Sequence, residues 1–404
     1  MIGTGYVGLV SGACFSDLGN KVYCLDKDQL KINKLNSGIS PIYEPGLNEI
    51  IKKNHKASRL IFTTNIKKAV NNSDIIFICV GTPNKKKSNN VDLSFVYKAV
   101  RDVLKFVKGR KIIITKSTVP IGTGDEIEKI IRKSKKRNID VISNPEFLRE
   151  GEAIRDFRYP DRIVIGSNNN KIFETMKKLY QPLTIKGSRF FKTSRRGAEL
   201  IKYASNAFLA TKISFINEIA KLTDFYGGDI NEIRSGMGSD VRINPNFLYA
   251  GIGFGGSCFP KDLSGLIHAF DQAKINSDLI KATLKVNDNQ KDYFLQKIYD
   301  LYSSDELLKK TITIWGIAFK SNTDDIRESV GMKIVQELSP KVANINVYDA
   351  IALKNAKNEL SNLKNISFYK SLPRSIKNAH FLIIATDSKE FWSFDHKLLT
   401  SLQD

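Results

Sequence analysis

The sequence predicts an α/β protein with two Rossmann-like, doubly wound parallel-sheet domains joined by a central helical domain with a long bridging helix. Short apolar strands alternate with amphipathic helices through the first half of the 404-residue chain. A long helical pattern follows, and the strand–helix alternation then resumes near the end. We therefore expect three domains, over residues 1–196, 197–308 and 309–404.

Five short apolar runs predict the strands of the first sheet. Each is followed by a stretch long enough for a helix, so we expect mainly parallel strands with helices on both faces. The runs cover residues 21–25, 75–80, 111–115, 140–143 and 162–166.

The central domain begins with a long helix over residues 197–224, where Ala204, Phe208, Phe215 and Leu222 recur at helical spacing. Further helices follow to about residue 308. Helices this long and apolar often form subunit contacts, so we expect a homodimer or a higher homo-oligomer. Residues 311–316, 344–348 and 380–386 then predict the second sheet, and a loose internal repeat suggests a second nucleotide-binding unit.

The segment Gly3-Thr4-Gly5-Tyr6-Val7-Gly8 has the GxGxxG spacing of a dinucleotide-binding turn. Its glycines allow a tight turn and let the backbone approach a pyrophosphate at the following helix N-terminus. Asp26, after the next strand, would bind ribose hydroxyls and repel a 2′-phosphate, which favours NAD over NADP. Lys27 and Lys31 lie close to Asp26 in the sequence, so NADP is not excluded as the cofactor.

Only Met1 and Ile2 precede this turn, although such a turn follows a full strand in the middle of the sheet. We expect that the first strand begins upstream of Met1; the alternative is a fold that has lost this central strand.

Cys258 stands out among the four cysteines because glycines precede it and a helix start follows in Gly253-Phe254-Gly255-Gly256-Ser257-Cys258-Phe259-Pro260-Lys261-Asp262. A helix N-terminus with Lys261 nearby favours the thiolate. Together with a hydride acceptor, a thiolate can trap an aldehyde as a thiohemiacetal, which is oxidised to a thioester and hydrolysed to an acid. The alternative is a glycine-rich turn kept only for packing.

The other three cysteines, Cys14, Cys24 and Cys79, lie in apolar segments and are expected in the core. No cysteine or histidine spacing indicates a metal site or a disulfide framework.

Three other polar residues could support such chemistry. Lys202 and Asn206 are four residues apart, so one helix face could hold an oxyanion with both; the alternative is a surface lysine and a packing asparagine. Glu146 follows a strand and could act as a general base; the alternative is a helix-capping acid beside a salt-bridged Arg149.

The chain is basic, with 63 Lys and Arg against 42 Asp and Glu and a formal charge of +21. A nucleic-acid-binding protein therefore stays open as an alternative. The basic residues are scattered, however, and are not interleaved with aromatic stacking residues. No apolar run is long enough to span a membrane and no secretory signal precedes the first motif, so no membrane partner is expected. Unpaired cysteines and a nucleotide-cofactor motif predict a cytoplasmic protein.

Taken together, the motifs resemble the nucleotide-sugar 6-dehydrogenase family over nearly the whole chain. The segments that carry the resemblance are GTGYVG at Gly3, residues 43–47, 80–83, 116–120, 144–151 and 198–202, the Cys258 motif and residues 316–320. The resemblance implies NAD-dependent four-electron oxidation of UDP-glucose to UDP-glucuronate. Alternatives are a sister enzyme acting on GDP-mannose or a UDP-N-acetyl sugar, a two-electron hydroxyacid dehydrogenase, and a basic nucleic-acid-binding or inactive truncated paralogue.

The resemblance also implies roles for individual residues. Cys258 is the nucleophile, Lys202 and Asn206 stabilise oxyanions, and Glu146 with Thr118 and Asp262 handles the proton and the hydrolytic water. The implied NAD contacts are Gly3, Thr4, Gly5, Tyr6, Val7, Gly8, Asp26, Lys31, Val80, Gly81, Thr82, Pro83, Ser117, Thr118, Glu150, Lys261 and Arg327.

The implied UDP-sugar contacts are Glu146, Phe147, Leu148, Arg149, Glu150, Lys202, Asn206, Arg242, Tyr249, Gly253, Phe254, Gly255 and Lys320. In this family the residue matching Arg242 reaches the neighbouring subunit's site. Relatives also continue beyond the position of Asp404 with a substrate-binding arginine, so we expect a further C-terminal segment.

Overall fold

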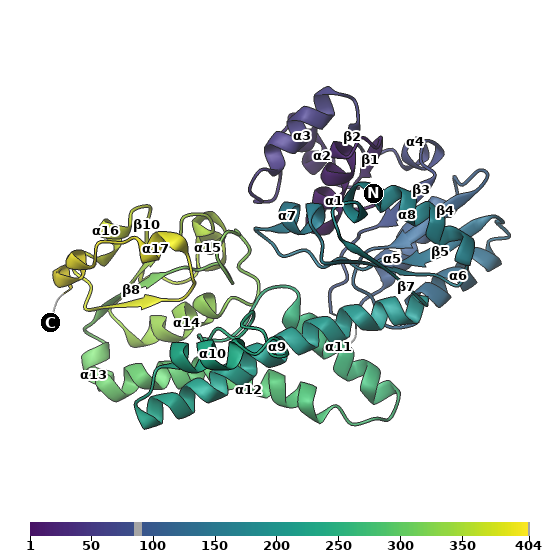
Figure 1. Ribbon diagram of the computed structural model, residues 1–404. Coiled ribbons are helices and arrows are strands. Elements are labelled where there is room, and N and C mark those ends of the chain that lie inside the picture. Colours follow the sequence, from purple (N-terminus) through teal and green to yellow (C-terminus); the bar gives the residue numbers. More distant parts are fainter. Residues whose placement is uncertain (85–90, 403–404) are drawn as a thin grey trace. The chain divides into compact units, whose positions relative to one another are not determined.

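The computed structural model describes residues 1–84 and 91–402 (Figure 1). By its internal contacts the chain forms two compact units, Met1–Ser205 with Ser264–Gln272, and Asn206–Leu263 with Ala273–Asp404. The boundary falls inside α9 (Arg195–Tyr226), a continuous 32-residue helix. The division into three domains stays a prediction.

The first unit contains a parallel sheet, with one antiparallel step, in the order β3-β4-β5-β6-β7. A parallel pair, β1 with β2, lies beside it. Ile2 bridges β1 and β3 by pairing with both Leu25 and Ile78, so it occupies the central strand position before the glycine turn. The strands are β1 (Val22–Leu25), β2 (Leu60–Thr63), β3 (Ile75–Ile78), β4 (Lys111–Thr115), β5 (Ile139–Ser143), β6 (Arg162–Gly166) and β7 (Arg189–Thr193).

Two separate apolar clusters form the core of this unit. One includes Leu9, Phe15 and Met176, and the other includes Val100 and Ile127. Cys14, Cys24 and Cys79 are buried in the first cluster, as expected for small core residues. The helices are α1 (Tyr6–Asp17), α2 (Gln29–Asn36), α3 (Leu47–Lys56), α4 (Ile66–Asn71), α5 (Ser94–Leu104), α6 (Thr123–Lys133), α7 (Ala153–Arg158) and α8 (Asn170–Thr184).

The second unit contains an all-parallel sheet in the order β10-β9-β8-β11. Its strands are β8 (Thr311–Trp315), β9 (Asn344–Tyr348), β10 (Ile366–Tyr369) and β11 (Phe381–Ile384). Its helices are α10 (Ile230–Gly238), α12 (Asp278–Leu301), α13 (Ser304–Leu307), α14 (Val330–Leu338), α15 (Leu353–Glu359), α16 (Leu372–Ile376) and α17 (Lys389–Trp392), and α11 (Phe259–Gln272) begins in it.

The predicted fold class is confirmed: two parallel sheets occur, and a long helical segment separates them in the sequence (Figure 1). The long helix begins at Arg195, two residues before the expected start, and extends to Tyr226. Within the described residues, no helix is both long and apolar enough to cross a bilayer.

Candidate active site

The glycine turn between Ile2 and α1 has the geometry that a dinucleotide needs. Gly3 has φ of +96°, and a Cβ there would lie 2.9 Å from the Cys79 carbonyl oxygen. A Cβ on Gly8 would lie 2.0 Å from the Gly3 carbonyl oxygen, so both positions require glycine. A Cβ on Gly5 meets no atom within 4 Å, which leaves the backbone at the start of α1 open to a pyrophosphate.

Asp26 follows β1 and lies against this turn. Its Oδ2 accepts hydrogen bonds from the Thr4 backbone N–H (2.9 Å) and hydroxyl (2.7 Å), and pairs with Lys31 Nζ at 3.3 Å. Burial alone would raise the pKa of Asp26, but the bonds from Thr4 and the backbone N–H of Asp28, with the Lys31 charge, hold it below its usual range. Asp26 is therefore an ionised acceptor where a ribose hydroxyl is expected.

Tyr6 connects the turn to the segment before α7. Its hydroxyl donates to Glu44, and the Gly151 N–H donates to both the Tyr6 hydroxyl (2.8 Å) and Glu44 Oε2 (2.7 Å). Burial and the Glu44 carboxylate, with a smaller contribution from the charge of Glu150, raise the pKa of Tyr6. The cluster gives Tyr6 a structural role in addition to its predicted place near the cofactor.

The segments that follow β3 and β4 are tied to each other. Ser117 Oγ donates to the Val80 carbonyl oxygen at 2.7 Å, and Thr82 Oγ1 donates to the Thr118 carbonyl oxygen at 2.9 Å. A Cβ on Gly81 meets no atom within 4 Å. Carboxyl ends of neighbouring parallel strands form the ligand crevice of such sheets, so these segments suit the predicted NAD contacts.

Glu146 and Lys202 form a buried ion pair in the first unit. Lys202 Nζ lies 3.1 Å from Glu146 Oε1, and the two side chains are 5% and 7% exposed. The Leu148 N–H donates to Glu146 Oε2 at 2.6 Å, and Lys202 Nζ lies 5.3 Å from the centre of the Phe147 ring. Lys202 is therefore not a surface lysine, and the sequence pattern alone could not show this.

Arg149 does not pair with Glu146. Its guanidinium binds Asp156 and Glu152, each at 2.7 Å, and its side chain is half exposed. Arg149 is thus salt-bridged, as the alternative interpretation of this segment expected, but its partners are carboxylates further along the chain and not Glu146.

The second unit contains a buried group around Asp262 at the start of α11. Asn206 Nδ2 donates to Asp262 Oδ2 at 2.6 Å, and Lys261 Nζ pairs with Asp262 Oδ1. Asp262 is 1% exposed, and Asn206 is buried with it. Asn206 therefore holds a carboxylate through its side chain and is more than a packing residue.

Cys258 directly precedes α11, and its carbonyl oxygen accepts the first-turn hydrogen bond from the Asp262 N–H at 2.8 Å. Its thiol is exposed, whereas the other three cysteines are buried. An exposed thiol at a helix N-terminus suits a nucleophile, because the helix dipole favours the thiolate.

Three predicted ligand contacts of the second unit lie at its surface. Arg242 binds Asp240, and Arg327 binds Asp325 two residues earlier. Tyr249 is 57% exposed, and the Arg234 guanidinium carbon lies 3.8 Å from its ring centre.

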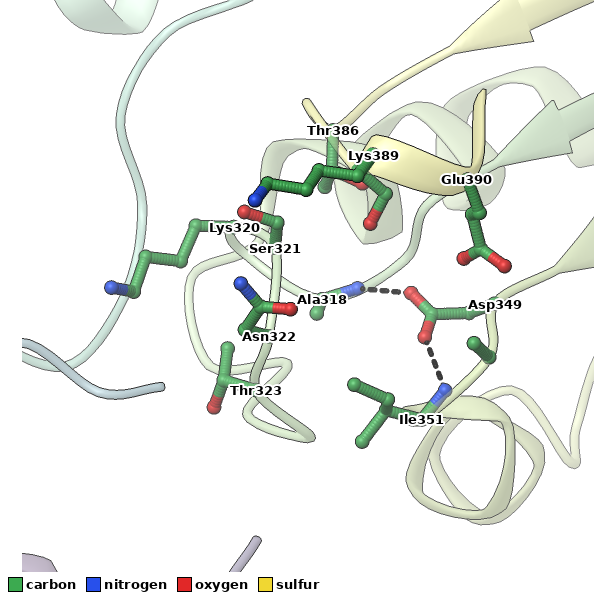
Figure 2. Close-up of a pocket in the computed structure, with 12 residues that line it drawn as sticks. Ala318, Lys320, Ser321, Asn322, Thr323, Asp349, Ile351, Thr386, Lys389 and Glu390 are labelled. Atoms are coloured by element: carbon green, nitrogen blue, oxygen red, sulfur yellow. Dashed lines mark hydrogen bonds between the residues drawn. The ribbon is translucent and has the colours of Figure 1, made fainter. Parts of the chain in front are cut away.

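Lys320 lines a cavity of about 190 Å³ beside the second sheet. Figure 2 shows Asp349 in this cavity, bonded to the backbone N–H groups of Ala318 and Ile351. The remaining lining includes hydroxyl groups and a second ammonium group, from Ser321, Thr323, Ser388 and Lys389. The cavity therefore offers polar partners next to a predicted UDP-sugar contact.

Sequence reasoning missed two buried polar residues that support the site. Glu199, on α9, accepts bonds from the N–H groups of Gly122 (2.6 Å) and Gly124 (2.9 Å) and from the Ser143 hydroxyl (2.8 Å). Lys116 is buried, and its Nζ lies 3.3 Å from Asn144 Oδ1. Burial lowers the pKa of Lys116 to about 8. Both residues lie in motifs that carried the family resemblance, and that was their only sequence signal.

Three family models match successive parts of the chain. Residues 1–184 match the NAD binding domain of the UDP-glucose/GDP-mannose dehydrogenase family, residues 196–289 its central domain, and residues 313–403 its UDP binding domain. The protein is thus a nicotinamide-dependent dehydrogenase by fold and cofactor domain, and the chain belongs to the UDP-glucose/GDP-mannose dehydrogenase family.

Individual relatives agree with this assignment. A UDP-glucose 6-dehydrogenase from Rhizobium meliloti (strain 1021) is 44% identical over 404 residues, covering 99% of this chain and 92% of the relative. The UDP-glucose 6-dehydrogenase TuaD from Bacillus subtilis (strain 168) is 43% identical, covering 96% and 83%. The solved structure of a UDP-glucose dehydrogenase from Pyrobaculum islandicum superposes with a TM-score of 0.92 at 35% identity, covering 98% and 91%.

Proposed function

We propose that the protein is an NAD-dependent UDP-glucose 6-dehydrogenase that converts UDP-glucose to UDP-glucuronate. The observation that carries the proposal is the exposed Cys258 thiol at the start of α11 in a chain whose first 184 residues match an NAD binding domain. The named relatives at 43–44% identity act on UDP-glucose by their names, which favours this substrate over GDP-mannose or a UDP-N-acetyl sugar.

NAD, when bound, accepts a hydride, so a four-electron oxidation needs two NAD molecules in turn. The residues proposed to hold it are Gly3 to Gly8, Asp26, Lys31, Val80 to Pro83, Ser117, Thr118, Glu150, Lys261 and Arg327. The open backbone at Gly5 and the ionised Asp26 fit a pyrophosphate and an adenosine ribose.

Cys258 supplies the covalent step. After the C6 alcohol has been oxidised to an aldehyde, the thiolate attacks C6 and a proton is taken up by the oxygen, which gives a thiohemiacetal. Removal of a second hydride and of that proton leaves a thioester. Water then adds to the thioester carbonyl, and departure of the thiolate gives the carboxylate product.

Lys202 and Asn206 are proposed to stabilise the negative charge that develops on the C6 oxygen. Each supplies an N–H donor from a buried position on α9, where hydrogen bonds to an oxyanion are strong because water is excluded. Glu146, with Thr118 and Asp262, is proposed to handle the proton and the hydrolytic water. In the described structure Glu146 holds Lys202 and Asp262 holds Asn206, so each carboxylate also orients a donor.

The UDP-sugar is proposed to contact residues 146–150, Lys202, Asn206, Tyr249, residues 253–255 and Lys320. Arg242, with its exposed guanidinium, is proposed to reach the site of a neighbouring subunit.

A homodimer is supported by a stripe of exposed apolar residues on α9. Phe208, Phe215 and Leu222 recur every seven residues and are 66%, 44% and 55% exposed. A seven-residue apolar repeat is typical of helices that pack against another helix. Light scattering should give twice the chain mass, and Phe215→Glu should shift the protein toward the monomer. The buried thiols of Cys14, Cys24 and Cys79 form no disulfide in the described part of the chain, which supports a cytoplasmic location.

The decisive test is the stoichiometry of NADH release. The protein with excess NAD should form two NADH for each UDP-glucose consumed, and far less with GDP-mannose or a UDP-N-acetyl sugar. Cys258→Ser should stop four-electron turnover, because a serine hydroxyl is a much weaker nucleophile at neutral pH. Ser257→Ala, at the neighbouring position, is the matched control and should keep the stoichiometry of two. Survival of four-electron turnover in Cys258→Ser would refute the thioester route.

A further inference from the structure

The glycine-rich loop before Cys258 is held in place by side-chain amides from two helices of its own unit. The loop backbone at Gly251 is bound on both sides: its N–H donates to Asn217 Oδ1 on α9 at 2.8 Å. Its carbonyl oxygen accepts from Gln290 Nε2 on α12, also at 2.8 Å. Neither bond belongs to a helix or a sheet, so the amides replace the backbone partners that regular structure would supply.

Phe254 is bound in the same manner by a single residue. Its N–H donates to Asn287 Oδ1 at 2.7 Å, and its carbonyl oxygen accepts from Asn287 Nδ2 at 3.0 Å. An asparagine side chain that both accepts from and donates to one residue acts like a neighbouring strand. We call Asn217, Asn287 and Gln290 the amide clamp; all three are buried.

Contacts on another side of the loop restrict it further. The Gly256 N–H donates to the Arg327 carbonyl oxygen at 3.0 Å. A Cβ on Gly255 would lie 2.1 Å from the Glu328 carbonyl oxygen, and one on Gly256 would lie 2.6 Å from the Phe319 ring. The loop backbone thus passes too close to its neighbours for any residue other than glycine at these two positions.

Residues 251–256 contain four glycines, and glycine has the largest conformational freedom of any residue. The loop cannot define its own conformation, so its order must come from its surroundings. Two polar atoms of the clamp, Asn217 Nδ2 and Gln290 Oε1, are buried and have no hydrogen-bond partner among the residues that the structure describes. Burial of a polar atom without a partner is costly, so these two amides do not sit where their own hydrogen-bonding capacity is fully satisfied.

We propose that the amide clamp positions the Gly251–Gly256 loop for the nucleotide sugar and thereby sets its KM, while leaving the binding of NAD unchanged. The three amides are positioning residues, because they act through the loop backbone. This inference rests on the proposed function, since residues 253–255 are assigned there to the UDP-sugar.

The primary test is Asn287→Asp. The new oxygen would face the Phe254 carbonyl oxygen, so a hydrogen bond becomes a repulsion at constant side-chain size. We expect the KM for UDP-glucose to rise about tenfold or more, with the KM for NAD changed by less than about twofold. The matched control is Asn289→Asp, which makes the same charge change at an exposed position two residues along α12. It should leave both constants unchanged.

A second variant keeps the test decisive if Asn287→Asp does not fold. Gln290→Met has a similar volume but lacks the donor to Gly251, and we expect it to weaken UDP binding about fivefold in calorimetry without weakening NAD binding. The inference is overturned if the folded variants lower the melting temperature but leave UDP-glucose KM and UDP affinity at wild-type values, or if they change the NAD constants equally.

Failure of the proposed function gives a different result. In that case the wild-type protein itself would form no NADH with UDP-glucose and would not bind UDP, whatever the variants do. If the wild-type protein turns over UDP-glucose and the clamp variants have the same constants, only the role of the clamp is overturned.

Discussion

Both parallel sheets of the molecule place an aspartate directly after a strand that borders a glycine turn: Asp26 after β1, and Asp349 after β9. The two carboxylates have different partners. Asp349 accepts four backbone N–H bonds, from Ile317 (2.8 Å), Ala318 (3.1 Å), Ile351 (2.9 Å) and Ala352 (2.8 Å). Asp26 binds the side chains of Thr4 and Lys31 as well as backbone N–H groups.

The glycines of the two turns also differ in how closely neighbouring atoms approach them. Gly316 follows β8 with φ of +87°, and a Cβ there would lie 2.0 Å from Thr386 Oγ1. The first turn is also crowded at Gly3 and Gly8, but Gly5 has open space where its Cβ would be. The comparison teaches that the aspartate after β9 is held by backbone N–H groups, whereas the aspartate after β1 also has side-chain partners that a ligand can replace.

Gly316→Ala should have the largest effect, because it combines an unfavourable φ with a clash against Thr386. We expect the free energy of unfolding to fall by roughly 4 kcal/mol. Gly5→Ala makes the same change at the open position of the other turn, where the methyl group meets no atom within 4 Å. It should cost less than about 1 kcal/mol of stability while raising the KM for NAD. Denaturant titration of both variants checks this, and equal destabilisation would contradict the comparison.

The second prediction concerns a buried charged group. In the first unit this group is the side chain of Lys116, which directly follows β4. The second sheet instead has neutral groups, where Thr313 Oγ1 and Asn346 Nδ2 both donate to the Ser375 carbonyl oxygen. Burial lowers the pKa of Lys116 from 10.5 to about 8, so between these pH values the unfolded chain binds more protons than the folded one. The free energy of unfolding should therefore rise with pH across this window.

The rise is expected to approach roughly 3 kcal/mol relative to Lys116→Met, which has no titrating group there. Urea titrations of both proteins at pH 7 and pH 10.5 measure it, because shared contributions cancel in the difference. A constant difference between the two proteins would show that Lys116 titrates normally.

Asp349→Asn should destabilise the second sheet by about 2 kcal/mol, because an amide NH₂ would face backbone N–H donors in place of a carboxylate oxygen. Thermal unfolding detects the loss. The affinity for NAD should not change, and a selective loss of NAD binding in this variant would contradict the structural role of Asp349.

Asp26→Asn should have the smallest effect on stability, since its partners include side chains that can rearrange. We expect the KM for NAD to rise about tenfold with an unfolding free energy within about 1 kcal/mol of the wild type. Steady-state kinetics at saturating UDP-glucose measure this. A loss of stability comparable to that of Asp349→Asn would remove the distinction between the two aspartates.

The strands that sequence reasoning found and two of those that it missed differ in burial. The five strands predicted for the first sheet were found because their apolar runs are buried, as at Ile113 and Ile142. The missed strands β2, β7 and β10 lie at sheet edges, but so does β11, which was predicted. Among the missed strands, β7 is largely exposed and β10 is only half-buried, so their sequences lack a strongly apolar run.

The sequence by itself determined the parallel-sheet class, the glycine turn with Asp26, and the Cys258 motif, because these depend on local spacing and on residue types that few other structures need. Only the tertiary structure decided that Lys202 is buried against Glu146, that Asp156 is a partner of the salt-bridged Arg149, and that three distant amides hold the loop before Cys258. Burial and pairing join residues far apart in the chain, and no local pattern records which polar group will meet which partner.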